Sequence, residues 1–217
     1  MKLPLKKVLG PLVPRRLIEE RDIVLRLGQA GRTYVKLRLL DTMGIRPSKP
    51  CPVPAGARSF LFVCYGNIMR SPMAELMLKR ALSQYHQEGI TVLSAGIHAT
   101  PGTEAHPRAR VAAPAFGLRL DDHRSRLLTG EMIANADAVF AMDLQNEAEL
   151  LTQFPQSANK IFLLSSYAEG GQRGRAIADP YFGDQDEMSR CCAVLRACIN
   201  NLARSMWPAP SPGASLE

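Results

Sequence analysis

Residues 63–72 read Val-Cys-Tyr-Gly-Asn-Ile-Met-Arg-Ser-Pro, so that Cys64 comes six positions before Arg70. The preceding residues 59–63 are apolar and rich in types that favour a strand, and residues 71–78 begin a helical pattern. We therefore expect a loop between a strand and the N-terminus of a helix. Unpaired backbone N–H groups and the positive end of the helix dipole make such a position a binding site for a dianion.

The residue types within this loop suit a bound phosphate. Gly66 allows the main chain to curl around the anion, and the planar guanidinium of Arg70 can grip two phosphate oxygens together. The same positive field favours a thiolate at Cys64. The helix that follows is expected to have Ser71 as its N-cap and Pro72 at its first position. The alternative for Cys64 is a small buried hydrophobe, but burial alone does not call for an arginine and a serine at these offsets.

A phosphate ester also needs a group that protonates the leaving oxygen, and a carboxylic acid such as Asp179 can do this. It lies in the segment Ala-Asp-Pro-Tyr-Phe-Gly-Asp of residues 178–184, which by itself is typical of an ordinary turn. Tyr181 and Phe182 are expected to be exposed beside the acid, where they can flank a substrate ring. Tyr65 either forms another wall of the same cleft or is a core aromatic.

Strand-like and helix-like segments alternate along the rest of the chain. Strands are expected at residues 90–94, 136–142 and 160–164, and helices around residues 107–116, 130–134, 143–154 and 188–206. This alternation is typical of an α/β fold, in which a parallel sheet is covered by helices on both faces. The loop with Cys64 then lies at the carboxyl end of the first strand, where ligands bind in open α/β sheets. The cysteines of the last helical segment are expected to be packing residues: Cys191, Cys192 and Cys198.

Positive charge is concentrated in the first quarter of the chain. Residues 1–58 carry 13 Lys and Arg against 4 Asp and Glu, a net charge of +9, whereas residues 59–217 carry 14 against 16, a net charge of −2. Apolar and basic residues alternate over residues 15–43, as in an amphipathic helix or a helix pair broken near Gly28 and Gly31. Such an extension can lie on anionic lipid, bind a partner protein or touch nucleic acid, or it can pack on the rest of the chain with its charges in solvent.

Composition divides the chain into four parts. A basic extension at residues 1–45 is followed by a proline- and glycine-rich linker at residues 46–57, a catalytic domain at residues 58–207 and a disordered tail at residues 208–217. The chain has 46% apolar and 22% charged residues, which is typical of a globular protein, and it contains no apolar run of about 18 residues. Five cysteines and no signal peptide fit a reducing cytoplasm. No cofactor is expected, and no metal is required, because the loop and Arg70 supply the positive charge. In agreement, ligand-type spacing with one another or with the cysteines is absent among the histidines: His86, His98, His106 and His123.

The stretch Cys64-Tyr65-Gly66-Asn67-Ile68-Met69-Arg70-Ser71-Pro72 resembles the active-site loop of the low-molecular-weight protein-tyrosine phosphatases. The family's pattern is Cys-x-Gly-Asn-x-Cys-Arg-Ser, usually followed by proline, and Met69 takes the place of its second cysteine. The likeness covers about residues 58–205 in the family's order, through Met73-Ala74-Glu75, Ser94-Ala95-Gly96, Asp122-His123-Arg124-Ser125, Ala136-Asp137, Met142-Asp143 and Asp179-Pro180-Tyr181. Motifs in register over such a length are more specific than a lone loop.

The resemblance implies a fold and a mechanism. It implies the strand order 2-1-3-4, and hydrolysis of phosphotyrosine and aryl phosphates through a phosphocysteine on Cys64, with Asp179 as the general acid. It implies that the phosphate is held by the loop: Tyr65, Gly66, Asn67, Ile68, Met69, Arg70 and Ser71. Asn67, Ser71 and His123 are then expected to order the loop from behind, and a plain packing role is the alternative for His123.

The resemblance also implies cytoplasmic phosphotyrosine proteins as partners, such as a bacterial tyrosine kinase of polysaccharide export. Residues 1–45 offer peripheral contact with an anionic membrane surface, and no specific nucleic acid is expected. A rival is an arsenate reductase of the same fold, which uses two further cysteines, but no cysteine occurs between Cys64 and Cys191. The other alternative is a phosphotyrosine-binding or scaffold protein that acts through its basic extension.

Overall fold

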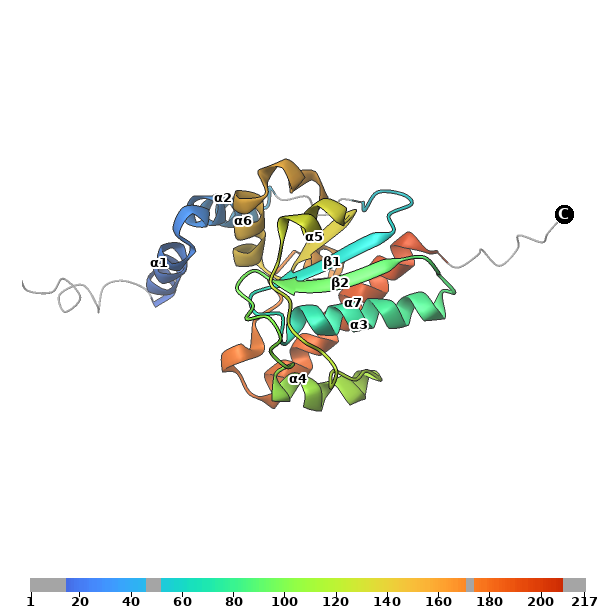
Figure 1. Cartoon of the computed structure of the whole chain (residues 1–217). Coiled ribbons are helices and arrows are strands. Elements are labelled where there is room, and N and C mark those ends of the chain that lie inside the picture. Colours follow the sequence, from blue (N-terminus) through green and yellow to red (C-terminus); the bar gives the residue numbers. More distant parts are fainter. Residues whose placement is uncertain (1–14, 46–51, 171–173, 209–217) are drawn as a thin grey trace, which may run out of the picture.

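The computed structural model of the chain describes residues 15–45, 52–170 and 174–208, with side chains from residue 19 onward in the first range. The first part of the expected extension, half of the expected linker at residues 46–57 and the tail after residue 208 lie outside the described residues. Figure 1 shows the described part as a sheet between layers of helices, with a helical hairpin at one side.

Four parallel strands form the sheet, in the order β2-β1-β3-β4. They are β1 (Ser59–Cys64), β2 (Thr91–Gly96), β3 (Ala138–Ala141) and β4 (Ile161–Leu163). The strand order and the parallel pairing confirm the expected fold. In the register of β1 with β2, Cys64 lies opposite Gly96, so that these two residues meet at the carboxyl edge of the sheet.

The helices follow the expected segments, with ends shifted by a few residues. Those after the extension are α3 (Arg70–Gln84), α4 (Pro107–Ala112), α5 (Gly130–Asn135), α6 (Leu144–Gln153) and α7 (Gln185–Met206). Short 3₁₀ turns lie between them, at η3 (Ala113–Phe116), η4 (Pro155–Lys160), η5 (Leu164–Tyr167) and η7 (Pro180–Phe182).

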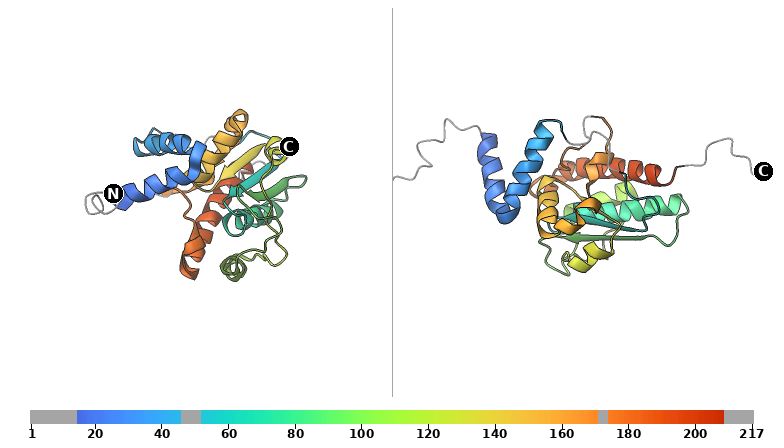
Figure 2. Two further views of the ribbon diagram at one scale, coloured as in Figure 1. Left: turned by 60° about the vertical axis from the view of Figure 1, so that its left-hand side comes forward. Right: turned by 90° about the horizontal axis from the view of Figure 1, so that it is seen from above.

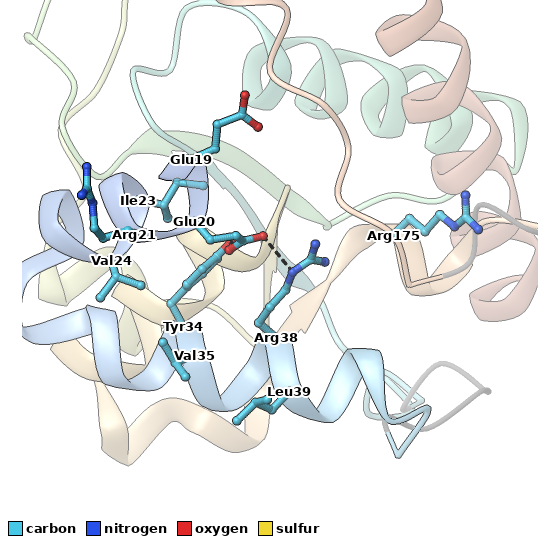
Figure 3. Close-up of a pocket in the computed structure, with 10 residues that line it drawn as sticks. All are labelled: Glu19, Glu20, Arg21, Ile23, Val24, Tyr34, Val35, Arg38, Leu39 and Arg175. Atoms are coloured by element: carbon cyan, nitrogen blue, oxygen red, sulfur yellow. Dashed lines mark hydrogen bonds and ion pairs between the residues drawn. The ribbon is translucent and has the colours of Figure 1, made fainter. Parts of the chain in front are cut away.

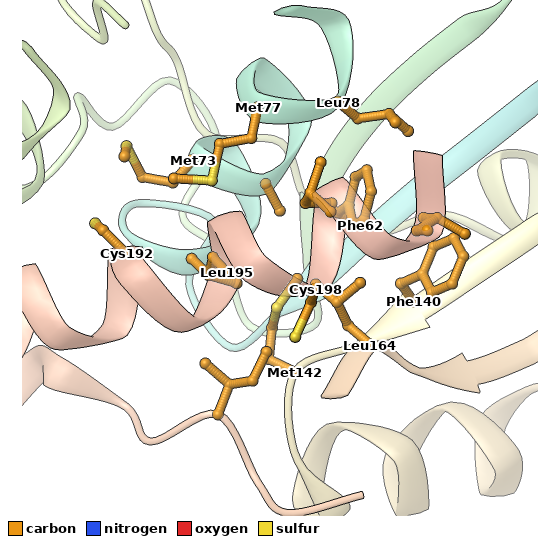
Figure 4. Packing of buried hydrophobic residues seen from close by; sticks show 14 of the residues in the cluster. Phe62, Met73, Met77, Leu78, Phe140, Met142, Leu164, Cys192, Leu195 and Cys198 are labelled. Atoms are coloured by element: carbon orange, nitrogen blue, oxygen red, sulfur yellow. The ribbon is translucent and has the colours of Figure 1, made fainter. Parts of the chain in front are cut away.

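Successive side chains of β1 point to opposite faces of the sheet and enter two separate cores. Phe62 packs with α3 and α7, and it stacks on Phe140 of β3 with ring centroids 5.3 Å apart (Figure 4). Leu61 and Val63 face the other way, toward α5, α6 and the extension. Because helices cover both faces, the strands are nearly continuous apolar runs, as parallel strands usually are.

The start of α3 differs from the expectation for Ser71. The helix begins at Arg70 with Met69 in the N-cap position, and the side chain of Met69 makes no capping bond. The buried hydroxyl of Ser71 instead lies 2.9 Å from the sulfur of Cys64. Pro72 occupies the third helical position, which is tolerated because the first four N–H groups of a helix have no intrahelical partner. The expected serine cap is therefore wrong, because this side chain faces the loop and not the helix end.

The last helix, α7, begins with a capping box and buries its cysteines. Asp184 accepts from the N–H of Glu187 at 2.8 Å, and the Glu187 carboxylate accepts from the N–H of Asp184 at 3.1 Å. Cys191, Cys192 and Cys198 are buried in the core with α3, which agrees with a packing role. Burial raises the pKa of each of these three thiols to about 12.

The described part of the extension is a helical hairpin. It consists of α1 (Arg15–Leu27), η2 (Gly28–Ala30) and α2 (Gly31–Thr42). Gly28 has a φ of 52°, in the left-handed region that glycine enters without steric cost. The expected helix pair, broken near this glycine, is confirmed.

The hairpin packs on the rest of the chain through α2 and α6. Ala30, Tyr34 and Leu37 are buried in one core with α6, and Thr33 Oγ1 lies 2.9 Å from Thr152 Oγ1. Figures 1 and 2 show the hairpin at the side of the molecule where α3 begins. The extension therefore lies on the same side of the molecule as the carboxyl end of β1. Within the described ranges, no helix is both long enough and apolar enough to cross a membrane.

Candidate active site

The loop after β1 wraps around the sulfur of Cys64. The backbone N–H of Asn67 donates to this sulfur at 3.3 Å, and the hydroxyl of Ser71 lies 2.9 Å from it. Asn67 turns the chain with a φ of 53°, in the left-handed region that asparagine tolerates better than most residues. All three residues are buried. The sulfur thus lies at the base of the loop and at the N-terminus of α3, where negative charge is favoured.

The side chain of Asn67 ties this loop to its surroundings. Its Nδ2 donates to Ser71 Oγ and to Ser94 Oγ, both at 2.9 Å, and its Oδ1 accepts from the N–H of Arg126 at 2.8 Å. Its backbone carbonyl accepts from His123 Nε2 at 2.7 Å. The left-handed turn at Asn67 is therefore held from four directions.

Ser71 is oriented by the same amide. A hydroxyl carries one proton, and Ser71 already accepts a hydrogen bond from Asn67. Its own proton is left for the sulfur of Cys64 at 2.9 Å or for the carbonyl of Ala95 at 3.3 Å. Donation to the sulfur, which is the nearer acceptor, stabilises the thiolate form.

A hydrogen-bond network behind Asn67 includes residues for which the sequence predicted no role. The hydroxyl of Ser94 donates to Glu75 Oε2 at 2.6 Å, and Arg126 Nη1 lies 3.5 Å from the same oxygen. Lys79 Nζ donates to the other oxygen of Glu75 at 2.6 Å. Ser94 and Glu75 occur in the motifs of the family resemblance, and that was their signal in the sequence.

His123 contacts the loop from behind, where the resemblance implied it. Burial lowers the pKa of its imidazole and outweighs the bond to Asn67 and the charge of Glu75, which raise that pKa. Arg126 and Arg124 lower it further. The neutral ring with its proton on Nε2 is the form that donates to the carbonyl of Asn67.

Gly96 leaves no space for a side chain between β2 and the loop. A Cβ on Gly96 would lie 2.7 Å from the backbone N of Asn67, 2.7 Å from the carbonyl O of Tyr65 and 2.8 Å from the carbonyl C of Gly66. The loop therefore rests directly on the end of β2, and only glycine permits this approach.

Arg70 is buried and directs its guanidinium at two carboxylates. Nη1 donates to Asp143 Oδ2 at 2.6 Å and to the carbonyl of Ile177 at 3.0 Å, and Nη2 donates to Asp179 Oδ2 at 2.6 Å. Burial alone would lower the pKa of Arg70, but the charges of Asp143, Asp179 and Cys64 outweigh burial and raise this pKa above its ordinary value. The guanidinium is therefore a permanent positive charge near the sulfur.

The two carboxylates on Arg70 differ in exposure. The side chain of Asp143 is 14% exposed and that of Asp179 is 43% exposed. Asp143 also caps α6 by accepting from the N–H of Asn146 at 2.8 Å, whereas Asp179 accepts from the N–H of Tyr181 at 3.1 Å. Asp143 is thus fixed between a helix end and Arg70, while Asp179 lies at the surface, where it can meet a substrate.

Three aromatic side chains lie at the surface near these groups. Tyr65 is 56% exposed, Tyr181 is 46% exposed and Phe182 is 94% exposed. The rings of Tyr181 and Phe182 meet edge to face with centroids 5.0 Å apart, directly after Asp179 in the chain. Tyr65 is therefore a surface residue, and its alternative as a core aromatic is wrong. Exposed ring faces are available to stack with an aromatic substrate.

Tyr65 packs against a histidine for which the sequence predicted no role in the site. Its ring lies against His98 with centroids 4.6 Å apart, and His98 Nε2 lies 2.6 Å from Glu149 Oε2. Glu149 is buried on α6, so the carboxylate that holds the imidazole is itself fixed.

The remaining loop residues, Ile68 and Met69, contribute no polar side chain. The carbonyl of Ile68 accepts from the N–H of His106 at 2.9 Å, and the His106 ring contacts Tyr181 with centroids 5.8 Å apart. Met69 is buried in the core with α3. Among the described residues, no group of three His, Cys, Asp or Glu side chains is arranged to hold a metal ion.

A hollow of ≈ 1020 Å³ lies between the two helices of the hairpin and Arg175 (Figure 3). Its apolar lining comes from Ile23 and Val24 on α1 and from Val35 and Leu39 on α2. Arg175 belongs to the segment that leads to Asp179.

Comparison with known proteins places these residues in context. The family model for the low molecular weight phosphotyrosine protein phosphatases matches residues 59–208 of the chain. A probable low molecular weight protein-tyrosine-phosphatase EpsP of Ralstonia nicotianae is 36% identical over 124 residues, which is 57% of this chain and 79% of that protein. A protein-arginine-phosphatase of Bacillus subtilis is 33% identical over 146 residues, which is 67% of this chain and 95% of that protein.

The fold is similar to that of a solved structure with an anion bound. The tyrosine phosphatase Wzb of Escherichia coli K30, in complex with sulphate, superposes with a TM-score of 0.62 and 25% identity. The similarity covers 68% of this chain and 97% of that one. The range of the family model leaves the hairpin at residues 15–42 outside it.

Proposed function

This chain belongs to the low molecular weight phosphotyrosine protein phosphatase family, and we propose the roles by which its own residues hydrolyse phosphotyrosine. It is a phosphoric monoester hydrolase of the type that works through a phosphocysteine. We assign the nucleophile to Cys64, phosphate binding to Arg70 and the loop, and general acid catalysis to Asp179. One observation carries this assignment: the loop that encloses the sulfur of Cys64 also carries Arg70, whose Nη2 donates to Asp179 Oδ2 at 2.6 Å.

In the first step, the thiolate of Cys64 attacks phosphorus in line with the leaving tyrosine oxygen. The S–P bond forms while the P–O bond breaks, and protonated Asp179 transfers its proton to the departing oxygen. Arg70 and the loop N–H groups hold the three equatorial oxygens, over which negative charge is spread in the transition state.

Arg70 changes one partner in this step. A protonated Asp179 holds the guanidinium less strongly than a carboxylate does, and this frees Nη2 for a phosphate oxygen. Nη1 remains bonded to Asp143 and to the carbonyl of Ile177, so the guanidinium keeps its position. Phosphate binding and release of the acid are thereby coupled through one side chain.

In the second step, water attacks the phosphocysteine and releases inorganic phosphate. Asp179, now a carboxylate, takes a proton from the attacking water. Cys64 departs as a thiolate, which is stabilised by the hydroxyl of Ser71 and by the N–H of Asn67.

The nucleophile and the acid are tested with two aryl phosphates of different leaving ability. Cys64→Ser should abolish turnover of p-nitrophenyl phosphate, and undiminished turnover would overturn its assignment. Asp179→Asn should slow phenyl phosphate by about 10²–10⁴-fold and p-nitrophenyl phosphate by less, because a poor leaving group needs the proton more. Asp186→Asn, an exposed acid in the first turn of α7, is the control. Equal losses on the two substrates would contradict the acid role of Asp179.

Phosphotyrosine proteins are the partners of this family. The exposed aromatic side chains near the loop support binding of a phosphotyrosine ring at this site. Because one similar protein is a protein-arginine-phosphatase, a phosphoarginine peptide of equal sequence is the matched competitor. We expect a higher kcat/KM for the phosphotyrosine peptide and a loss of this preference in Tyr65→Ala. A higher kcat/KM for the phosphoarginine peptide would overturn the choice of substrate.

We further propose that one such partner is a bacterial tyrosine kinase of polysaccharide export, on the basis of the family likeness alone. The autophosphorylated kinase would be incubated with the full chain or with Cys64→Ser, and its phosphotyrosine content followed with time. Loss of phosphotyrosine only with the wild-type chain is expected. Equal phosphotyrosine content in both reactions would contradict this partner.

We also propose that the basic extension touches an anionic membrane surface. Support comes from the net charge of +9 in residues 1–58 and from exposed side chains outside the hollow, among them Leu25, Arg26, Arg32 and Lys36. The full chain should sediment with vesicles that contain phosphatidylserine more than with phosphatidylcholine vesicles. The double variant Arg32→Glu with Lys36→Glu should lose this difference. Equal sedimentation of the wild-type chain with both vesicles would contradict membrane contact.

A further inference from the structure

The reaction does not use the hollow formed by α1, α2 and Arg175 (Figure 3). Its apolar lining is open to solvent, since Leu39 is 56% exposed and Val35 is 41% exposed. Apolar side chains grouped in a concave surface favour the binding of an apolar group from a partner.

Two of the charged side chains of the hollow, Glu20 and Arg38, are paired with each other. Glu20 accepts from the hydroxyl of Tyr34 at 2.7 Å and from Arg38 Nε at 3.1 Å. Arg38 Nη1 also lies 3.6 Å from Asp41 Oδ2. Arg175 is exposed and has no carboxylate partner among the described residues. One positive charge of the hollow is therefore available for an acidic group.

One side of the hollow leads directly to the catalytic acid. Arg175 comes two residues before Ile177, whose carbonyl accepts from Arg70, and four residues before Asp179. A fully extended chain advances by about 3.3–3.6 Å per residue. A substrate segment at Arg175 and a phosphotyrosine at the loop can therefore belong to one short peptide.

The other side of the hollow is formed by the hairpin, which packs on α6. Burial and the bond to Glu20 raise the pKa of Tyr34, and the charge of Asp143 contributes to the same rise. Asp143 is the carboxylate that holds Arg70 Nη1 at 2.6 Å. Asp143 also caps α6, the helix on which the hairpin packs through Tyr34, Leu37 and the contact of Thr33 with Thr152.

We propose that this hollow docks the substrate protein next to its phosphotyrosine, and that it takes a short segment with an apolar and an acidic side chain. The apolar side chain packs on Val35 and Leu39, and the carboxylate pairs with Arg175. This docking rests on the phosphatase activity proposed above. It gives the hairpin, which the family model does not include, a part in substrate selection.

The charge of the docked segment is tested by kinetics on the full chain. Two phosphotyrosine peptides of equal length are compared, one with leucine and glutamate near the phosphotyrosine and one with serine and lysine. Arg175→Glu should lower kcat/KM for the acidic peptide by about three- to tenfold, mainly through KM, because an exposed ion pair becomes a repulsion. The rate on p-nitrophenyl phosphate, which is too small to reach the hollow, should not change. Arg32→Glu makes the same change in net charge outside the hollow and is the matched control.

The apolar side of the docked segment is tested with a second pair of variants. Leu39→Gln should raise KM for the leucine-containing peptide by about threefold, with no effect on p-nitrophenyl phosphate. Leu25→Gln is the matched control, because Leu25 is an exposed leucine of the same hairpin that does not line the hollow.

The outcomes separate the docking from the activity on which it rests. An unchanged kcat/KM for the acidic peptide in Arg175→Glu would overturn the docking alone, and so would an equal loss on p-nitrophenyl phosphate. If the wild-type chain fails to release p-nitrophenol, the proposed activity fails, and the docking fails with it. Two other results would also overturn the proposal if the peptide kinetics of Arg175→Glu and Leu39→Gln are unchanged. Loss of vesicle binding in these variants would assign the hollow to lipid, and loss of self-association would assign it to a second copy of the chain.

Discussion

Gly96→Ala is predicted to damage the active-site loop. The added Cβ would lie 2.7 Å from the backbone N of Asn67 and from the carbonyl O of Tyr65. Cβ contacts under 3.0 Å essentially never occur, so the loop must retreat by at least 0.3 Å, and by 0.7 Å to reach an ordinary contact of 3.4 Å. Both obstacles are backbone atoms, so no change of rotamer can relieve the clash.

The size of the effect follows from this displacement. Overpacking of a close contact costs about 1–3 kcal/mol of unfolding free energy. A misplacement of about 1 Å at reacting groups costs on the order of 10²-fold in rate. For a shift of 0.3 to 0.7 Å at the base of the phosphate loop, we expect kcat/KM to fall by about 10- to 100-fold.

The assay combines hydrolysis of p-nitrophenyl phosphate with urea unfolding of the same preparation. Gly130→Ala is the matched control, because the nearest atom to its added Cβ is Phe154 Cε1 at 3.7 Å, an ordinary contact. The control should keep the wild-type kcat/KM. An unchanged kcat/KM in Gly96→Ala, or an equal loss in both variants, would refute the conclusion that the loop rests on this glycine.

Three further predictions concern His123, Met69 and Asp143. Burial lowers the pKa of His123 in the folded protein below its ordinary value of 6.5. The stability that the neutral imidazole contributes is therefore fully present above pH 6.5. It is lost as the pH falls below 6.5, by at most about 1.4 kcal/mol of unfolding free energy per pH unit. Urea titrations at several pH values should show a shallower fall for His123→Gln, and identical slopes would contradict this. Met69 cannot form a disulfide with an oxidised Cys64. Burial raises the pKa of the α7 thiols, so these thiols are poor nucleophiles for the same reaction. Peroxide inactivation should therefore be poorly reversed by dithiothreitol, and ready recovery of activity would contradict this prediction. Asp143→Asn removes a charged partner of Arg70 and should weaken inhibition by inorganic phosphate about tenfold, and an unchanged inhibition constant would exclude that role.

Local sequence patterns were sufficient for most of the fold. Apolar runs and helical periods depend on neighbouring residues, and they predicted every strand and the helix pair at Gly28 to within a few residues. Ser71 is a position where the local sequence pattern gave a wrong prediction. Its residue type and position suit an N-cap, but contacts with Cys64 and Asn67 from other parts of the loop take its hydroxyl.

The candidate site likewise contains residues that local sequence predicted and residues that it did not. Cys64 and Arg70 were predictable together, because they lie six positions apart in one loop and this spacing determines their relative position. Asp143 had no assigned role, although it occurs in a motif of the resemblance. Its contact with Arg70 joins residues 73 positions apart, and no local pattern encodes such a pair.

From its order of residues alone, this chain could be assigned a phosphate-binding loop, a nucleophile and a parallel α/β sheet, since each is set by neighbours along the backbone. Folding settled the partners of Arg70, the network behind Asn67 and the position of the hairpin against α6. These features arise where segments distant in sequence bury apolar surface together. The side chains that meet there are chosen by packing in three dimensions and not by spacing along the chain.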